Sequence, residues 1–383
     1  AANGDDMKQL LRSLTMLGSV ALIGACASAG GGAGGTATSD GTGTPGPSTG
    51  DQNASGQNAI WPIKTREHVD LWLHGYALLQ EDTTFVPFFR RGYSTDITVL
   101  KNRANAVSQL DANRDKLRAR LQVNPQLINA QFVPLSFPSW NEMTRTIDLF
   151  IRANGDPRAA SSMEQANSIA FLAAYFQTGA DRDWLRLFVQ SLSDESAKFY
   201  HSYWLQQQRE RANVLEVVDT LWQRTYRPRM QRFLANTQQA SGDVLLSLPL
   251  DGEGRSLTNG KQSNTITVTF PDRPSDATDA IYVIAHEVVS ALAATAVTDN
   301  ITPEQRRTGL GERYQSSAAV RGGALLLQRV APELLDGYMR YYLRSVNRPA
   351  GGNLQSTFLS TFTLTDTIRD ALNRQLDVVL GGI

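Results

Sequence analysis

The sequence predicts a mainly α protein of the α+β class: a helical domain with a small antiparallel sheet beside one long apolar helix. Three patterns support this fold. Apolar residues recur with helical spacing across most of residues 60–240. Residues 243–250 and 264–270 are strand-like, and the second segment alternates β-branched residues with period two. Residues 280–297 then form an almost uninterrupted apolar run, which is the composition of a buried helix.

The charge balance excludes one class of partner. The 383 residues carry 37 basic and 37 acidic side chains, a formal net charge of zero. Such a chain has no excess of positive charge to bind a phosphate backbone, so we expect no nucleic-acid partner. The 41% hydrophobic content is that of an ordinary globular protein.

The N-terminus has the composition of an export signal. Lys8 and Arg12 supply positive charge after Met7, and residues 16–23 form a short apolar segment that ends shortly before Cys26. The acidic residues that precede Met7 do not suit such a signal, so we expect Met7 to be the start.

Residues 22–26 resemble the lipobox of a bacterial lipoprotein, in which small residues precede a cysteine that becomes lipidated. The resemblance implies that residues 1–26 are a signal region and that a lipid on Cys26 anchors the protein in the membrane of the cell envelope. Ala27 and Ser28 stand where an Asp would favour the inner membrane, so the resemblance points to the outer membrane. Cys26 is the only cysteine, which excludes a disulfide within the chain.

Composition divides the rest of the chain into three parts. Residues 27–59 are mostly Gly, Ser, Thr, Ala and Pro, which bury too little apolar surface to fold, and we expect a flexible tether. Large apolar and aromatic residues begin at Ile60. Residues 60–240 predict a helical domain, and residues 241–383 predict an α+β region.

Apolar periodicity and capping patterns locate the helices of the first part. We expect helices over residues 64–80 and 99–121, and two more within residues 181–236 with a kink at Pro228. Capping patterns mark further helix starts after Asn124, Ser139 and Ser162.

In the last part, turn-rich residues 251–255 link the two predicted strands, and Asp276 or Asp279 should cap the apolar helix. Small residues on this helix and on the later segment 312–330 predict that the two helices pack closely. The remaining helices are predicted after Thr302 and over residues 312–330, 333–343 and 356–380.

The centre of the apolar helix carries one adjacent ionisable pair, His286 and Glu287. A buried pair of this kind costs several kcal/mol, about the penalty of an uncompensated buried charge, unless something offsets it. One interpretation is that the two side chains satisfy each other or nearby backbone groups. The other is that they form part of a metal site.

The segment His286-Glu287-Val288-Val289-Ser290 resembles the zincin signature His-Glu-x-x-His, with serine in place of the second histidine. The resemblance implies His286 as a zinc ligand and Glu287 as general base. A strand pair precedes the signature helix in zincin peptidases and binds an extended substrate, which would be a peptide or protein. Hydroxyl is a poor zinc ligand, so Ser290 implies a degenerate site whose cofactor is zinc or none.

The gluzincin branch of that family takes its third ligand from a Glu on a later helix. By spacing, Glu312 occupies this position, 22 residues after Ser290. By local pattern Arg321 occupies it, and a guanidinium cannot bind a cation. In that register an ion pair between Arg321 and Glu287 would replace the metal.

Three functions remain open. The one we favour is an envelope lipoprotein with a zincin-like metallopeptidase fold whose site is degenerate, with little or no activity. The second is an active zinc metallopeptidase that uses His286, Glu287 and Glu312. The third is a non-catalytic helical binding or scaffold lipoprotein in which the His-Glu pair is coincidental. A strand pair beside the His-Glu helix favours the first two over the third.

The lipobox generates the first testable prediction. Because the lipid would be the only anchor, Cys26→Ser should release the protein from the membrane fraction into the soluble fraction. Fractionation followed by immunoblotting measures this, and intact-mass analysis of the native protein should show a lipidated N-terminal Cys26. An unmodified N-terminus upstream of Cys26 would contradict the prediction.

Overall fold

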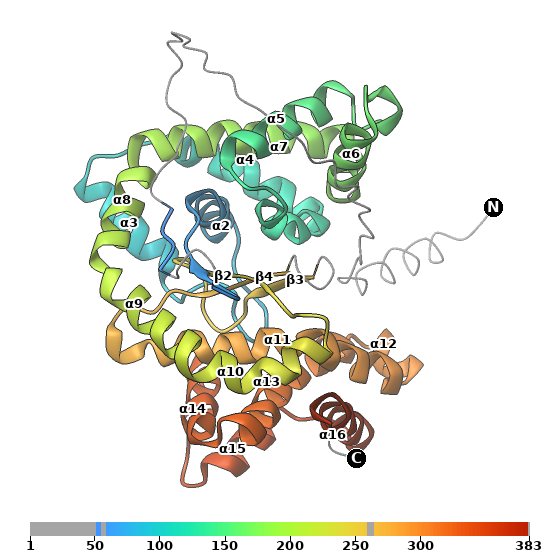
Figure 1. Ribbon diagram of the computed structural model, residues 1–383. Coiled ribbons are helices and arrows are strands. Elements are labelled where there is room, and N and C mark those ends of the chain that lie inside the picture. The colour runs from blue at the N-terminus through green and yellow to red at the C-terminus, as the bar shows by residue number, and fades with distance from the viewer. Residues whose placement is uncertain (1–50, 55–58, 259–263, 382–383) are drawn as a thin grey trace, which may run out of the picture.

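The computed structural model describes residues 51–54, 59–258 and 264–381. The predicted lipobox and Cys26 lie outside this part, as does most of the tether. The described part is mainly helical with one small sheet, which confirms the predicted mainly α, α+β class (Figure 1).

The sheet lies at the centre of the protein, with a buried helix on each face (Figure 1). Helix α2 (Glu67–Leu79) lies on one face, where the Ser247 hydroxyl donates to Asp70 at 2.5 Å. Helix α11 (Thr278–Asn300) lies on the other face, where the Ser256 hydroxyl donates to the backbone oxygen of Glu287 at 2.9 Å. Further helices surround these three layers.

The sheet is mixed, so the predicted antiparallel arrangement is wrong. Its strand order is β1-β2-β4-β3, with β1 parallel to β2, β2 parallel to β4, and only β3 antiparallel to β4. After β2 the chain passes over the position of β4 and forms β3 at the edge of the sheet. It then reverses direction, and β4 fills the place between β3 and β2, parallel to β2. The bounds are β1 (Ile63–Lys64), β2 (Gly242–Ser247), β3 (Arg255–Thr258) and β4 (Asn264–Thr269).

Glycines explain part of this arrangement. A Cβ added at Gly242 would lie 2.2 Å from the backbone oxygen of Asn264, and one at Gly254 would lie 2.2 Å from that of Thr267. Both positions therefore require the close backbone approach that only glycine permits. The predicted linker 251–255 therefore leads into β3, which begins at Arg255.

The first part of the chain follows the predicted helices with one exception. Residues 99–121 form parts of two helices rather than one, because Asn105 has a φ of +49° and Ser108 starts a new helix through a capping box with Asp111. The bounds are α3 (Tyr93–Arg103), α4 (Gln109–Val123), η2 (Pro125–Ser136), α5 (Trp140–Arg152), η3 (Pro157–Ala159) and α6 (Met163–Tyr175).

The two helices predicted within residues 181–236 are confirmed, and they meet at Arg211. Each contains a π-helical turn. The second turn ends just before Arg227-Pro228, the predicted kink, where the missing N–H of Pro228 falls in the first turn of the next helix. The bounds are α7 (Gly179–Glu195), η4 (Ser196–Tyr200), α8 (His201–Glu210), α9 (Ala212–Leu221), η5 (Trp222–Tyr226) and α10 (Arg227–Asn236).

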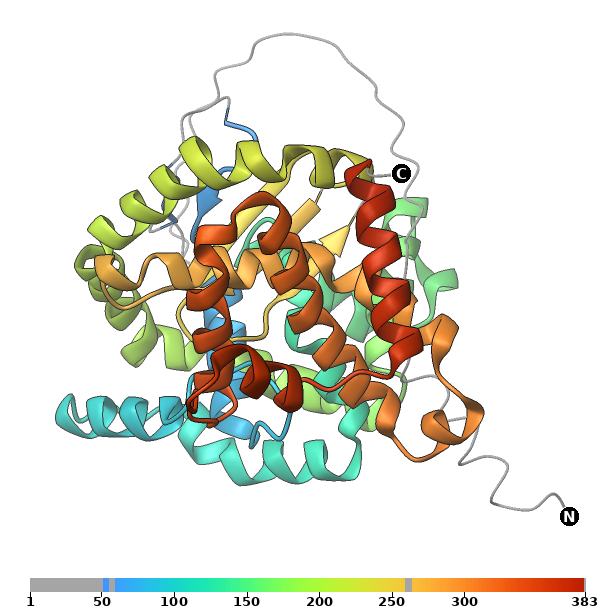
Figure 2. The same ribbon diagram turned by 90° about the horizontal axis from the view of Figure 1, so that it is seen from below.

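The C-terminal helices form an outer layer over α11, as the view from below shows (Figure 2). The predicted close packing of small residues is confirmed: a Cβ added at Gly322 would lie 3.2 Å from Val289 of α11. The predicted helix 356–380 is interrupted between two shorter helices. The bounds are η6 (Pro274–Asp276), α12 (Pro303–Arg307), α13 (Leu310–Val330), η7 (Pro332–Leu334), α14 (Leu335–Ser345), α15 (Leu354–Thr361) and α16 (Asp366–Leu380).

Helix α11 begins differently from the prediction. Ala277 is its N-cap, and neither predicted aspartate caps it, because Asp276 pairs with Arg273 at 3.0 Å and Asp279 pairs with Arg344 at 3.3 Å. By length and composition the segment Pro274–Asn300 could cross a membrane, but 72% of its apolar window is buried inside the protein. It therefore has the burial of a core helix.

Helix α2 is buried along its whole length and still carries a carboxylic acid, Asp70. The Asp70 carboxyl group accepts hydrogen bonds from Trp204 Nε1 at 2.9 Å and from the Leu248 backbone at 3.4 Å, in addition to the Ser247 hydroxyl. Burial raises the pKa of Asp70 to about 7, although these hydrogen bonds lower it. The carboxyl group therefore holds its proton up to near-neutral pH.

This shift predicts how stability depends on pH. The unfolded chain loses the Asp70 proton near pH ~4, whereas the folded protein keeps it to about pH 7, so stability falls as the pH rises between these values. Asp70→Asn mimics the protonated acid: its oxygen can accept from Trp204 and Leu248, while its amide donates to Ser247. Urea denaturation should show the stability of the variant relative to wild type rising by about 2.5 kcal/mol between pH 5 and pH 8, because the wild type loses stability over this range and the variant does not.

The exposed Asp115→Asn is the control for this experiment and should change the stability little at either pH. If the difference in stability between Asp70→Asn and wild type is the same at pH 5 and at pH 8, the pKa of Asp70 is not raised by burial.

Candidate functional site

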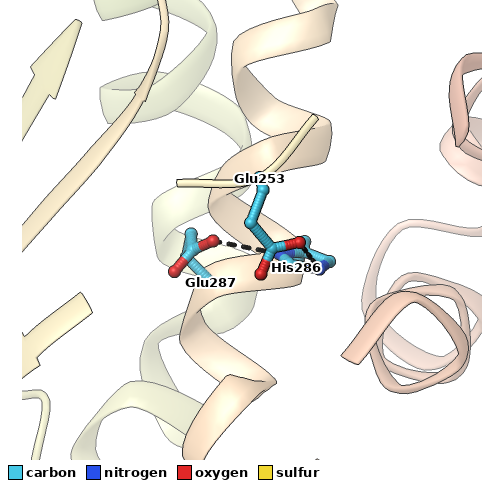
Figure 3. Close-up of side chains that lie close together, drawn as sticks. All are labelled: Glu253, His286 and Glu287. Atoms are coloured by element: carbon cyan, nitrogen blue, oxygen red, sulfur yellow. Dashed lines mark hydrogen bonds and ion pairs between the residues drawn. The ribbon is translucent and has the colours of Figure 1, made fainter. Parts of the chain in front are cut away.

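The His-Glu pair lies in the middle of α11 and faces the connection between β2 and β3. The side chain of His286 is fully buried and that of Glu287 is 4% exposed. Glu253, from this connection, reaches the same point (Figure 3). Among the described residues these three are the only group of His, Cys, Asp or Glu whose ligand atoms could hold a metal ion, with all such atoms within 4.8 Å of one another.

The Glu287 carboxylate is held by the start of β3. Its Oε1 accepts from the Gly254 backbone N–H at 2.9 Å. The Ser256 hydroxyl is shared between the Glu287 backbone oxygen at 2.9 Å and Oε2 at 3.2 Å. A Cβ at Gly254 would also lie 3.3 Å from the Glu287 side chain, so glycine lets the backbone come this close. These bonds fasten the edge of the sheet to α11.

His286 lies between two carboxylates. Its Nδ1 is 3.1 Å from Glu287 Oε1, and its Nε2 is 3.5 Å from Glu253 Oε2 (Figure 3). The ring stacks on Tyr342 at a centroid distance of 5.3 Å, and the Tyr342 hydroxyl donates to the backbone oxygen of Gly252 at 3.0 Å. The imidazole is thus fixed on both edges and on one face.

Burial and the charge of a neighbouring side chain shift the pKa in opposite directions, both for Glu253 and for His286. Burial raises the pKa of Glu253 above its usual range, and the neighbouring His286 opposes this rise. Burial lowers the pKa of His286, but Glu253 and Glu287 outweigh it, and the net pKa is raised. Positive charge at the imidazole is therefore favoured by its two neighbours.

The structure does not assemble the zinc ligands that the signature requires. The Ser290 hydroxyl donates to the backbone oxygen of Glu287 at 2.8 Å, one turn back on the same helix. Glu312 is exposed in the first turn of α13 and lies outside the cluster. The donor set of a gluzincin site therefore does not fit: of its three ligands only His286 is in place.

The predicted ion pair between Arg321 and Glu287 is also wrong. Arg321 Nη1 donates instead to the backbone oxygen of Phe362 at 3.2 Å. The Glu287 oxygens accept instead from Gly254 and Ser256 at the edge of the sheet.

Glu253 is the site residue that the sequence analysis missed. It was interpreted as part of a turn-rich linker, since glycine precedes and follows it. The available signal was a third carboxylate directly before a strand that the fold places against the His-Glu helix. Without the β3 pairing, nothing in the sequence indicates that Glu253 and His286 meet.

The other three histidines all have protein partners among the described residues. His74 contacts Tyr93 at 2.9 Å and Glu195 at 3.1 Å. His201 contacts Glu67 at 2.8 Å. They contrast with His286, whose Nε2 has no hydrogen-bond partner among the described residues.

A separate polar recess, with a volume of about 420 Å³, opens beside the N-terminus of α11. Its charged side chains largely satisfy one another. Arg90 and Arg211 both bind Asp272, at 2.6 and 2.7 Å, and the Tyr341 hydroxyl donates to Asp251 at 3.3 Å. The His286 cluster is therefore the stronger candidate site.

Comparison with known proteins adds no assignment: no family model, no curated protein and no solved structure matches this chain.

Proposed function

We propose that this protein is a lipid-anchored component of the bacterial cell envelope whose zincin-like site is degenerate and does not hydrolyse peptides. The observation that carries the proposal is the position of Glu287. Its carboxylate accepts two hydrogen bonds from the start of β3 and contacts its neighbour His286. In this position the residue braces the sheet against α11.

A catalytic base in a zincin must take a proton from a metal-bound water. Glu287 is poorly placed for this, since it is 3% exposed and both of its oxygens accept from the protein. The second imidazole of the signature is replaced by Ser290, which bonds its own helix. These features support a protein that resembles a zincin peptidase but does not hydrolyse peptide bonds.

Two further arguments support the proposal. Strands β3 and β4 pack beside α11, which favours the zincin-like interpretation over a coincidental His-Glu pair in a helical scaffold. The envelope location rests on the lipobox-like residues 22–26 alone.

An active zinc metallopeptidase is the second candidate function. The observation in its favour is that Glu253, His286 and Glu287 bring their ligand atoms within 4.8 Å of one another. In that case Glu253 would take the place that the sequence analysis gave to Glu312.

Activity and metal content distinguish the two candidates. We expect the purified protein to carry well under one equivalent of zinc, because two of the three signature ligands are missing. Casein cleavage should stay at background, unaffected by a chelator, in wild type and in Glu287→Gln. Glu312→Gln, a change at an exposed carboxylate, is the matched control. Stoichiometric zinc together with cleavage that is abolished by a chelator and by Glu287→Gln would establish the active enzyme instead.

A further inference from the structure

Two buried polar atoms face each other in the His286 cluster without a hydrogen bond between them. Nε2 of His286 and Oε2 of Glu253 are 3.5 Å apart. Neither atom has a hydrogen-bond partner among the described residues, and both are buried. Buried polar atoms are nearly always satisfied, so this pair requires an explanation.

The other edge of the ring fixes which nitrogen carries the proton. Nδ1 lies 3.1 Å from Oε1 of Glu287, and a carboxylate can only accept, so Nδ1 must be the donor. In the protonated imidazole Nε2–H pairs with Glu253, whereas the neutral imidazole, which is the form that binds a metal ion, has a free lone pair on Nε2. This lone pair faces the Glu253 carboxylate, an arrangement of two electron-rich atoms that positive charge between them would stabilise.

The separation of the two atoms matches a bridging metal ion. Two ligands of a tetrahedral zinc, with bonds of about 2.0–2.1 Å, are roughly 3.4 Å apart. Imidazole nitrogen and carboxylate oxygen are donors that zinc and its neighbours in the first transition row accept. A carboxylate on the far nitrogen, here Glu287, is the usual outer partner of a metal-bound histidine.

We propose that Nε2 of His286 and Oε2 of Glu253 together bind one divalent first-row metal ion such as zinc, with Glu287 orienting the imidazole. This site uses a ligand outside the zincin signature and goes beyond the proposed function. Two protein ligands give weak, exchangeable binding, with solvent completing the coordination. Part of the Glu253 side chain is exposed, 23% in all, although its Oε2 is buried, so the site lies just below the surface. Such a site loses its ion during purification and refills when the ion is supplied.

Zinc titration of the full-length protein by isothermal calorimetry tests the site. Wild type should bind one equivalent in a saturable manner. Glu253→Gln should lower the affinity at least 10-fold by removing a ligand, and Glu287→Gln should lower it about 10- to 100-fold through the outer partner. Glu312→Gln, which changes an exposed carboxylate on α13, should bind as wild type does.

Thermal unfolding with and without zinc is the second readout. Zinc should raise the Tm of wild type and of Glu312→Gln, and raise that of Glu253→Gln less. The melts without zinc verify that each variant folds; if Glu253→Gln does not, Glu253→Asp, which retracts the carboxylate, gives the same test. Absence of saturable binding in wild type would mean that only a proton bridges the two atoms, and equal binding by Glu253→Gln would place zinc elsewhere. Either result overturns this proposal, whereas casein cleavage would overturn only the proposed function.

Discussion

The contact between the Glu287 carboxylate and the start of β3 determines much of this structure. A buried carboxylate must be compensated, and here a backbone N–H from Gly254 and a hydroxyl from Ser256 compensate it. Because these donors belong to the edge of the sheet, the same bonds fix where the sheet lies against α11. The geometry also brings Glu253 to His286, and so creates the one cluster of potential metal ligands in the described part of the chain.

A second buried carboxylate acts in a similar way on the opposite face of the sheet. Asp70 of α2 accepts from Ser247 and Leu248, where β2 ends, and Glu287 of α11 accepts where β3 begins. The connection between the two strands is thus held at both ends by acids from helices on opposite faces. The two acids differ in one respect: Asp70 retains its proton to about pH 7, while Glu287 contacts an imidazole.

Local signals in the sequence located most of the helices and the apolar α11, because apolar spacing depends on neighbouring residues. They did not predict the breaks within residues 99–121 and 356–380 or the N-cap of α11. They were insufficient for the order of the strands, since the parallel pairing of β2 with β4 depends on a crossover that periodicity does not encode. The candidate site divides in the same way. His286 and Glu287 are adjacent and were found, whereas Glu253 lies 33 residues before His286 and required the sheet. Glu312 was chosen by its spacing from Ser290 and Arg321 by local pattern, and the structure places neither in the cluster: Glu312 is exposed and Arg321 donates to Phe362.

The central claim is that Glu287 braces β3 against α11, and hydrogen exchange at the Gly254 amide tests it most directly. Glu287→Ala removes the acceptor of that N–H, and a buried unpaired group costs about 1–3 kcal/mol. The account predicts that the Gly254 amide then exchanges on the order of 10- to 100-fold faster, while the amides of α4 are unchanged. Ser290→Ala removes a hydrogen bond on the same turn of α11 and should leave this amide protected. Equal protection of Gly254 in wild type and in Glu287→Ala would contradict the claim.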